Sequence, residues 1–391
     1  MGDIDSSLKK LTRGTAEIIS IDLLKEKLTR SLKTQKPLCI KAGFDPTAPD
    51  IHLGHLVLLR KLRQFQDLGH RVFFLIGDFT AQIGDPTGRD QLRSKMDPKD
   101  IQENAKTYKA QVLKILDPKK TEIVFNSSWL SALKPQDILE LTALSSVAQM
   151  LARADFKKRF EDGREISLLE FIYPLLQGYD SVHLKADVEL GGSDQKFNLL
   201  MGRQLQEAFG QPPQAVIMTP LLEGTDGTKK MSKSLDNYIG ISEPPKQIFG
   251  KVMSISDELM YRYYEILTDC DLNEVKQLHP KEAKMKLARE IAGQFYETEV
   301  VHEAQLEFEK IFSQKQLPDD IDIYRLDSKD GERLIDVLVK SKLVQSKNEA
   351  RRLLKENAIS HEGVKIEDEN WPVREGVLKV GKRRFLKLVK G

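Results

Sequence analysis

The fold of this chain is organised around one stretch, GFDPTAPDIHLGH at residues 43–55. An apolar run at 38–40 precedes it and is typical of a buried strand, while the two prolines favour an extended turn. We expect Asp50 to cap the following helix, because a carboxylate can accept the free N–H groups of a first turn. Apolar residues then recur at helical spacing as far as Gly69. The sequence therefore predicts a strand, a turn and a helix in this order.

Two histidines, His52 and His55, stand three residues apart on the first turn of that helix, with Gly54 between them. The free N–H groups and the positive dipole end suit a phosphate, and imidazoles add donors without a large fixed charge. Gly54 has no side chain, so a flat ring could lie against the backbone. A nucleotide site, a zinc pair and ordinary surface histidines are the alternatives. Zinc fits poorly, because no glutamate separates the histidines and no nearby cysteine completes a tetrahedral set.

Length and charge limit the class of protein. With 391 residues the chain exceeds the usual single core, so we expect two or three domains. Hydrophobic residues make up 40%, and the charged 31% nearly cancel to +2, which excludes a disordered acidic chain and a uniformly basic surface. Residues 331–391 hold 15 Lys and Arg against 9 Asp and Glu, so they carry +6 and the preceding residues carry −4. This asymmetry predicts a polyanionic partner for the C-terminal end.

The cysteines and the apolar runs bear on the cellular compartment. Cys39 and Cys270 lie far apart in sequence, so no disulfide framework is expected and a reducing, cytoplasmic compartment is favoured. We recognise no signal peptide and no apolar run long enough to span a bilayer, so no membrane partner is expected.

Residues 36–125 alternate between strand and helix patterns, with strands expected at 38–41, 71–76 and 121–125. This alternation predicts an α/β fold with a doubly wound parallel sheet of the Rossmann-like kind, in which ligands bind at the carboxyl ends of the strands. The expected parts are a Rossmann-like domain at 1–240 with a helical insertion at about 135–181, a helical domain at 241–315, a linker at 316–330 and a small α+β domain at 331–391.

Two glycine-rich turns follow expected strands. The first, GDFTAQIGDPTGR at 77–89, has no Lys-Ser or Lys-Thr ending, so it is not a P-loop and on its own is typical of an ordinary turn. The second, GGSDQ at 191–195, follows a strand expected at 187–190. Its glycines let the backbone approach a ligand, and Asp194 and Gln195 are placed to contact it.

A polar stripe crosses an otherwise apolar helix at Tyr173, Gln177 and Asp180. These residues stand at i, i+4 and i+7, so they share one helical face. The stripe either faces water or is buried for a function, since buried polar groups need partners. The pattern alone is more typical of a solvated face.

A lysine-rich segment, GTDGTKKMSKS at 224–234, follows a strand expected at 215–218. Three lysines among glycines and small hydroxyl residues are typical of a mobile cationic loop rather than a packed element. Such a loop can close over a polyphosphate and neutralise charge as it develops. A solvated run of charge is the alternative.

The C-terminal part combines a basic helix with strands. Ser346 and Glu349 form a capping box for a helix expected to end at Asn357, and a hairpin is expected around 362–363. A basic helix on a small sheet suits the backbone of structured RNA, and a solubilising appendage is the alternative. The candidate RNA-binding residues are Arg351, Arg352, Lys355, Lys382, Arg383 and Arg384.

Two of these motifs form a known pair. HLGH at 52–55 and KMSKS at 230–234, in this order on a doubly wound sheet, resemble the signature motifs of class I aminoacyl-tRNA synthetases. Within that class the resemblance is to the bacterial tyrosyl-tRNA synthetases, and it covers nearly the whole chain. It extends to a C-terminal module similar to the ribosomal-type RNA-binding fold. The motifs that carry this closer resemblance are GFDPT at 43–47, GDPTG at 84–88, the polar stripe at 173–180 and GGSDQ at 191–195.

The resemblance implies a reaction and its partners. L-tyrosine and ATP would form tyrosyl-adenylate and pyrophosphate, after which tyrosine passes to the 3′-terminal adenosine of tRNA(Tyr). Since the substrate carboxylate is the nucleophile, catalysis would rest on alignment and charge stabilisation. Mg²⁺ is expected as the counter-ion of ATP, with no metal-ligand set of the protein and no tightly bound cofactor. The family also implies a homodimer, for which we expect an interface at 145–159 with Val147, Met150 and Leu151 in contact.

The resemblance also implies roles for individual residues. The catalytic set, which Arg89 or Arg93 would assist, is Thr47, His52, His55, Lys230 and Lys233. The ATP-binding set is Asp45, Gly54, Gly192, Asp194, Lys230, Met231, Ser232, Lys233 and Ser234. The tyrosine-binding set is Asp85, Tyr173, Gln177, Asp180 and Gln195. Asp180 would accept the phenol hydroxyl, so phenylalanine would leave a buried carboxylate without its donor.

Some positions depart from the family pattern. Lys41 stands where one branch has a tyrosine that gives the phenol a second partner, and Ala42 and Leu58 offer no side-chain hydrogen bond to a ribose. Two other functions compete with this interpretation: a tryptophanyl-tRNA synthetase, and a non-catalytic RNA-binding protein that keeps a synthetase fold.

Overall fold

The computed structural model describes residues 4–47, 49–87, 97–313, 322–326, 333–369, 371–381 and 384–390. The chain forms two compact units, residues 1–301 and residues 302–391. Helix α15 (Thr298–Ser313) crosses from the first unit into the second.

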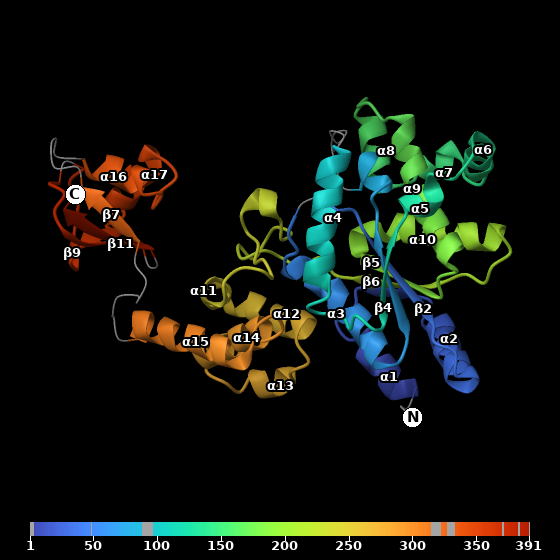
Figure 1. The fold of residues 1–391 in the computed structure, drawn as a ribbon, viewed down its shortest axis with the longest axis horizontal. Coiled ribbons are helices and arrows are strands. Elements are labelled where there is room, and N and C mark those ends of the chain that lie inside the picture. Colours follow the sequence, from blue (N-terminus) through green and yellow to red (C-terminus); the bar gives the residue numbers. More distant parts are fainter. Residues whose placement is uncertain are drawn as a thin grey trace. The chain divides into compact units, whose positions relative to one another are not determined.

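The first unit is built on a sheet with the strand order β1-β6-β5-β2-β3-β4 (Figure 1). Strand β1 is antiparallel to β6, and all other neighbours are parallel. The order reverses between β2 and β5, which is where doubly wound sheets bind ligands at their carboxyl ends. The predicted fold class is confirmed. The strands are β1 (Glu17–Ile19), β2 (Cys39–Phe44), β3 (Arg71–Ile76), β4 (Thr121–Phe125), β5 (Val188–Gly192) and β6 (Ala215–Thr219).

Helices connect these strands and continue beyond the last one. Those up to α10 are α1 (Ile4–Thr12), α2 (Ile21–Thr34), α3 (Leu53–Asp67), α4 (Pro98–Val112), α5 (Ser127–Leu130), α6 (Pro135–Ala143), α7 (Val147–Leu151), α8 (Ala154–Glu161), α9 (Leu168–Leu184) and α10 (Lys196–Ala208). Those after β6 are α11 (Pro245–Ser254), α12 (Asp257–Leu267), α13 (Leu272–Val275) and α14 (Pro280–Ala292). Short 3₁₀ turns lie at η1 (Thr80–Gln82), η2 (Ser193–Gln195) and η3 (Lys233–Leu235).

Helix α3 is held on the sheet by its apolar face. Leu53, Leu56, Leu59, Leu62 and Phe65 have no exposed surface, as their helical spacing predicts. This burial fixes the first turn of α3 beside the carboxyl end of β2.

Helix α9 carries the polar stripe and packs closely on α10. Ser167 and Glu170 form a capping box at its start. A Cβ at Gly178 would lie 3.2 Å from the backbone carbon of Met201 and 3.3 Å from Gly202 N, so glycine favours the close approach of the two helices. The close packing fixes the stripe relative to the sheet.

The second unit has a sheet in the order β7-β11-β10-β8-β9, against which α16 (Leu334–Lys340) and α17 (Lys347–Lys355) share one apolar core. The range 316–330, expected to be a linker, contains strand β7, which pairs in parallel with β11. The prediction is therefore wrong for 323–326, and apart from residue 322 the rest of that range lies outside the described residues. The hairpin predicted at 362–363 joins β8 to β9. The strands are β7 (Ile323–Leu326), β8 (Ile359–His361), β9 (Val364–Lys365), β10 (Gly376–Val380) and β11 (Arg384–Lys390).

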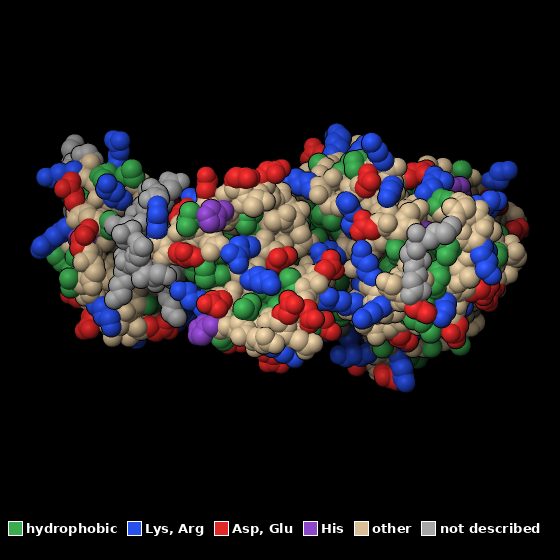
Figure 2. All heavy atoms as spheres, turned by 90° about the horizontal axis from the view of Figure 1, so that it is seen from below, with side chains coloured by type: hydrophobic (Ala, Val, Ile, Leu, Met, Phe, Trp, Pro, Cys, Tyr) green, Lys and Arg blue, Asp and Glu red, His purple; other side chains and the backbone are tan. Residues whose placement is uncertain are grey.

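The surface carries both signs of charge. Lys and Arg are interspersed with Asp and Glu over the face in Figure 2, in agreement with the small net charge of +2. Among the described helices, none is long and apolar enough to cross a membrane.

Candidate active site

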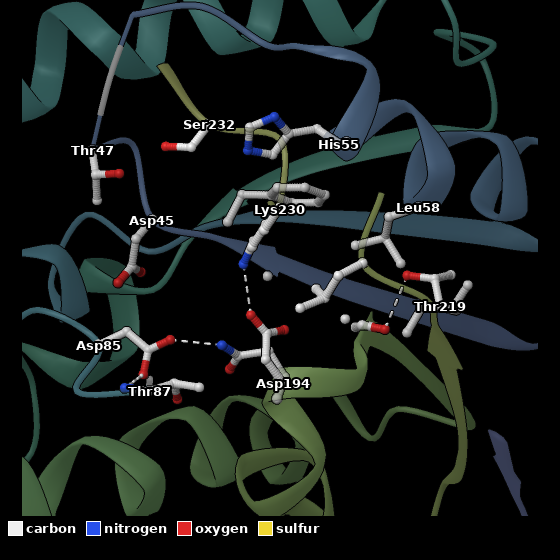
Figure 3. Close-up of a pocket in the computed structure, with 18 of the residues that line it drawn as sticks. Asp45, Thr47, His55, Leu58, Asp85, Thr87, Asp194, Thr219, Lys230 and Ser232 are labelled. Carbon is white, nitrogen blue, oxygen red and sulfur yellow. Dashed lines mark hydrogen bonds and ion pairs between the residues drawn. The ribbon is translucent and has the colours of Figure 1, made fainter. Parts of the chain in front are cut away.

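A cavity of about 740 Å³ opens where the strand order reverses. Its walls come from the ends of β2 and β5, from α9, from the first turn of α3 and from the segment 219–235 (Figure 3). Every residue predicted for the catalytic, ATP-binding and tyrosine-binding sets lines it. Arg89 and Arg93 lie outside the described residues. Residues 190 positions apart in the sequence, such as Phe44 and Ser234, therefore line the same cavity.

The two histidines form the cap of α3. His52 is the N-cap, and its Nδ1 accepts a hydrogen bond from Gly54 N at 3.1 Å, while His55 Nδ1 accepts from His52 N at 3.3 Å. Since each Nδ1 is an acceptor, each neutral ring carries its proton on Nε2. Burial lowers the pKa of His55 to about 4 and that of His52 further, so both rings stay neutral donors near pH 7.

The predicted capping role of Asp50 is wrong. His52 takes the N-cap position, and the Asp50 carboxylate forms an ion pair with Lys233 instead. A Cβ at Gly54 would lie 2.9 Å from the His52 ring. Glycine is thus required here so that the His52 imidazole can fold back over the backbone.

The lysine-rich segment lies over the cavity with its charges paired. Lys230 contacts Asp194 at 2.7 Å, and Lys233 contacts Asp50 at 2.9 Å (Figure 3 shows the first pair). The expectation of a loop without packing is only partly right, because Met231 is buried and Ser232 N donates to Asn237 Oδ1. The segment is therefore anchored at Met231 while its lysine head groups remain near solvent.

A second part of the cavity, around Tyr173, is lined by a network of hydrogen-bonded polar side chains. The Tyr173 hydroxyl donates to Asp45 at 2.9 Å, and Gln195 Nε2 donates to Asp85 at 2.7 Å. Asn198 donates to the side-chain oxygens of both Gln177 and Gln195 at 3.0 Å. Burial raises the pKa of Tyr173 well above its usual range, so its hydroxyl keeps its proton and still offers lone pairs to a further donor.

Asp180 lies at the base of this part of the cavity and is only 1% exposed. Trp129 Nε1 donates to its Oδ1 at 2.8 Å, and Asn126 Nδ2 donates to its Oδ2 at 3.3 Å. Burial raises the pKa of Asp180 to about 7, against the opposing effects of Lys41 and of these two hydrogen bonds. The polar stripe is thus buried among partners, and the solvated alternative is wrong for Asp180.

Comparison with known proteins identifies the family. Residues 33–313 match the family described as tRNA synthetases class I (W and Y), and residues 313–386 match the Tyrosine--tRNA ligase SYY-like C-terminal domain. The tyrosine–tRNA ligase of Desulfotalea psychrophila is 50% identical over 100% of this chain and 99% of its own length. That of Aquifex aeolicus is 51% identical over 99% of each. The chain belongs to the class I tyrosine–tRNA ligases.

Solved structures share the fold of this tyrosine–tRNA ligase. The mitochondrial tyrosyl-tRNA synthetase of Coccidioides posadasii is 24% identical with a TM-score of 0.62, covering 78% of this chain and 92% of that one. The Archaeoglobus fulgidus enzyme, solved with L-tyrosine, is 22% identical with a TM-score of 0.62, covering 78% and 100%. The predicted activity is confirmed: the protein activates tyrosine with ATP and attaches it to tRNA.

Several residues at the site were not found by sequence reasoning. Asn126 and Trp129 hold Asp180, and Thr80 donates to Asp45 at 2.8 Å. Trp129 lies on α5, Asn126 directly precedes it, and Thr80 lies on η1 within the glycine-rich turn at 77–89. The sequence does not mark these residues as partners of Asp180 and Asp45, so only the fold brings them to the site. Sequence reasoning singled out Asp50 as a helix cap, whereas the structure pairs it with Lys233.

The candidate RNA-binding residues lie in the second unit. Arg351, Arg352 and Lys355 are exposed on α17, although Arg351 forms an ion pair with Glu369 at 3.0 Å. Arg384 is tied to Leu343 O and to Glu349, so it is less free to contact RNA than predicted. Lys382 and Arg383 lie outside the described residues.

Proposed function

We propose that the two ends of the cavity divide the reaction of this tyrosine–tRNA ligase between them. The end with His52, His55, Lys230 and Lys233 binds the triphosphate, and the end above Asp180 binds the side chain of tyrosine. The observation that carries the proposal is that these groups line a single cavity of about 740 Å³.

Activation proceeds by attack of the tyrosine carboxylate on the α-phosphorus of ATP. A new oxygen–phosphorus bond forms, and the bond to the leaving pyrophosphate breaks with its electron pair. Thr47 and the Nε2–H groups of His52 and His55 donate to the phosphates, while Lys230 and Lys233 exchange Asp194 and Asp50 for pyrophosphate oxygens. These donors stabilise the charge that develops on the leaving group.

The nucleoside and its counter-ion complete this end. Asp45, Gly54, Gly192, Asp194 and the segment 231–234 surround the adenosine. Mg²⁺ enters with ATP as part of the substrate.

The amino acid is held by hydrogen bonds at both of its ends. Asp85, Gln177 and the Tyr173 hydroxyl oxygen accept from its ammonium group, and Gln195 lies near its carboxylate. Its phenol donates to Asp180. Phenylalanine would bury this carboxylate without the donor, which costs on the order of 1–3 kcal/mol or more for a charged group.

Two further assignments concern assembly. Transfer needs tRNA(Tyr), whose backbone we assign to the basic face of α17 with Arg351, Arg352 and Lys355. We also propose a homodimer through α6 to α9, because Leu139, Val147, Phe160 and Leu168 are each more than 60% exposed. Met150, expected at this interface, is buried against its own chain instead. A cytoplasmic site of action agrees with two free cysteines.

The test is ATP–pyrophosphate exchange with each of the twenty amino acids, followed by charging of tRNA(Tyr). We expect tyrosine to support exchange, and Asp180→Asn to weaken tyrosine binding selectively. If Asp180→Asn binds tyrosine as the parent does, the assignment of the phenol to Asp180 is wrong. Sedimentation of the parent and of Phe160→Glu tests the dimer, which is wrong if the parent sediments as a monomer at micromolar concentration.

A further inference from the structure

The side chain of Lys41 belongs to the lining of the cavity and has no exposed surface. It extends from β2 and makes three polar contacts: Glu189 Oε1 at 2.8 Å, Ser181 Oγ at 2.8 Å and Gln177 O at 3.0 Å. An ammonium group has three N–H donors, so this set uses all of them. Lys41 therefore cannot donate to a ligand without giving up one of these partners.

Glu189 lies on β5, is 1% exposed and completes the network of polar contacts around Lys41. Its Oε2 accepts from Ser181 Oγ at 3.0 Å and from Gln214 Nε2. A Cβ on Gly202 would lie 2.6 Å from Gln214 and 3.1 Å from Glu189 and Ser181, so α10 is packed directly against these groups. The pair is thus fixed on all sides by packing as well as by hydrogen bonds.

Two of the partners of Lys41 flank Asp180 on α9. Gln177 lies one turn before Asp180 and Ser181 directly follows it. The charged and titratable groups that act on Asp180 are Lys41 from β2 and Glu189 from β5, and Tyr173 lies on α9 itself. Beyond Tyr173 lie Asp45, after β2, and Asp85.

We propose that Lys41 and Glu189 form a positioning pair that determines the specificity for tyrosine. Lys41 holds α9 with Asp180 facing the substrate phenol, and its charge favours the ionised carboxylate that accepts the phenol hydrogen. Glu189 fixes Lys41 in place and limits the strength of this electrostatic effect. The inference rests on the proposed contact between the phenol and Asp180.

The pair acts on Asp180 with opposite signs. The Lys41 ammonium lowers the pKa of Asp180. This effect is larger than the opposite effect of the Glu189 charge, which raises the pKa of Asp180. Removing the negative charge alone should therefore lower the midpoint of the pH dependence of tyrosine binding. Removing both charges should raise it. A purely structural role would weaken binding in both variants at every pH without moving the midpoint.

The experiment measures the dissociation constant of tyrosine by equilibrium dialysis from about pH 5.5 to about pH 8.5 for the full-length protein. Glu189→Gln keeps a hydrogen-bond partner for its new amide, because Gln214 Oε1 is buried without a partner and can accept from it if Gln214 flips. It leaves the Lys41 ammonium without its counter-ion and should lower the stability, so thermal unfolding is measured first to establish that the variant is folded at the assay temperature. Lys41→Met combined with Glu189→Gln leaves no buried unpaired charge at this site. We expect the midpoint to fall in the single variant and to rise in the double variant, each by roughly half a pH unit or more.

Lys27→Met is the matched control. Lys27 is also a buried lysine, 3.4 Å from Asp187, but it does not line the cavity. The Lys27→Met variant should have the same midpoint for the pH dependence of tyrosine binding as the parent. An unchanged midpoint in both Glu189→Gln and the double variant overturns the inference. If Asp180→Asn retains the pH dependence of the parent, the phenol contact itself is wrong, which separates the two failures.

Discussion

The two ends of the cavity handle charge in opposite ways. At the phosphate end, the side chains of Lys230 and Asp194 are 55% and 27% exposed, and those of Lys233 and Asp50 are 25% and 52% exposed. Ion pairs near solvent contribute about 0–1 kcal/mol, so these can be exchanged for phosphate at little cost. At the tyrosine end, Lys41, Glu189 and Asp180 are buried and fully partnered, and breaking such a set is strongly destabilising.

The difference follows from what each end must do. Lysines that stabilise a leaving group need to move from one anion to another, and partial exposure keeps that exchange possible. A group that separates tyrosine from phenylalanine must keep one geometry, and burial makes a missing hydrogen bond costly. We therefore expect substitutions at the phosphate end to change the rate and those at the tyrosine end to change selectivity.

The largest expected effect is that of Lys233→Ala. Loss of one donor at a developing anion costs about 100- to 1000-fold in rate, so we expect ATP–pyrophosphate exchange to fall by this factor. Tyrosine binding should be unchanged, because the tyrosine end is built from other residues. Lys229→Ala is the matched control, since Lys229 is exposed on the same loop but does not line the cavity. Equal losses in both variants would contradict the assigned role.

Asp180→Asn comes next in size and acts on selectivity. A hydrogen bond to a charged partner contributes about 1.5–3 kcal/mol, so tyrosine binding should weaken roughly 10- to 100-fold. Phenylalanine should lose nothing, because it never supplied the donor. Comparing the kcat/KM of exchange for the two amino acids measures the effect. A parallel fall for both would assign Asp180 to folding rather than to discrimination.

Sequence reasoning located the phosphate end better than the tyrosine end. The strands at 71–76 and 121–125 and the apolar face of α3 follow from local periodicity, and the two signature motifs mark the residues of the end that we assign to the triphosphate. No motif or periodicity in the sequence marked the residues that surround Asp180. Trp129 and Asn126 are about fifty residues away in sequence and contact Asp180 only once the sheet has formed.

Two errors have physical causes of the same kind. Strand β7 lies in a polar, acidic segment whose composition suggests a linker, and it is a strand because β11 offers an edge to pair with. Asp50 is a good N-cap by residue type, but the His52 imidazole takes that place and leaves the carboxylate for Lys233. In both cases a tertiary partner overrides the local preference.

The pH dependence of tyrosine binding tests the buried end without a mutation. The pKa of Asp180 is raised to about 7 in the free protein, and in our proposal the phenol donates to the ionised form. The affinity for tyrosine should therefore fall below pH 7, by up to about tenfold per pH unit, and be flat above it. Because a raised carboxyl pKa disfavours the folded state at higher pH, stability of the free protein should decrease from about pH 4 to about pH 7. Calorimetric titration and thermal unfolding across this range measure both, and a constant affinity would show that the phenol does not meet Asp180.

The smallest expected effect is that of Asp50→Asn, and it tests whether the resting ion pair competes with ATP. Lys233 loses its partner at 2.9 Å, a contact near solvent that contributes at most about 1 kcal/mol. If Asp50 only occupies Lys233 in the absence of ATP, the KM for ATP should fall, by at most about fivefold, and the difference should shrink at high salt. Asp236→Asn removes the same charge nearby without changing the lining of the cavity. A rise in the KM for ATP would instead mean that Asp50 helps to bind the nucleotide, and the phosphate end would then hold a fixed contact of the kind found at the tyrosine end.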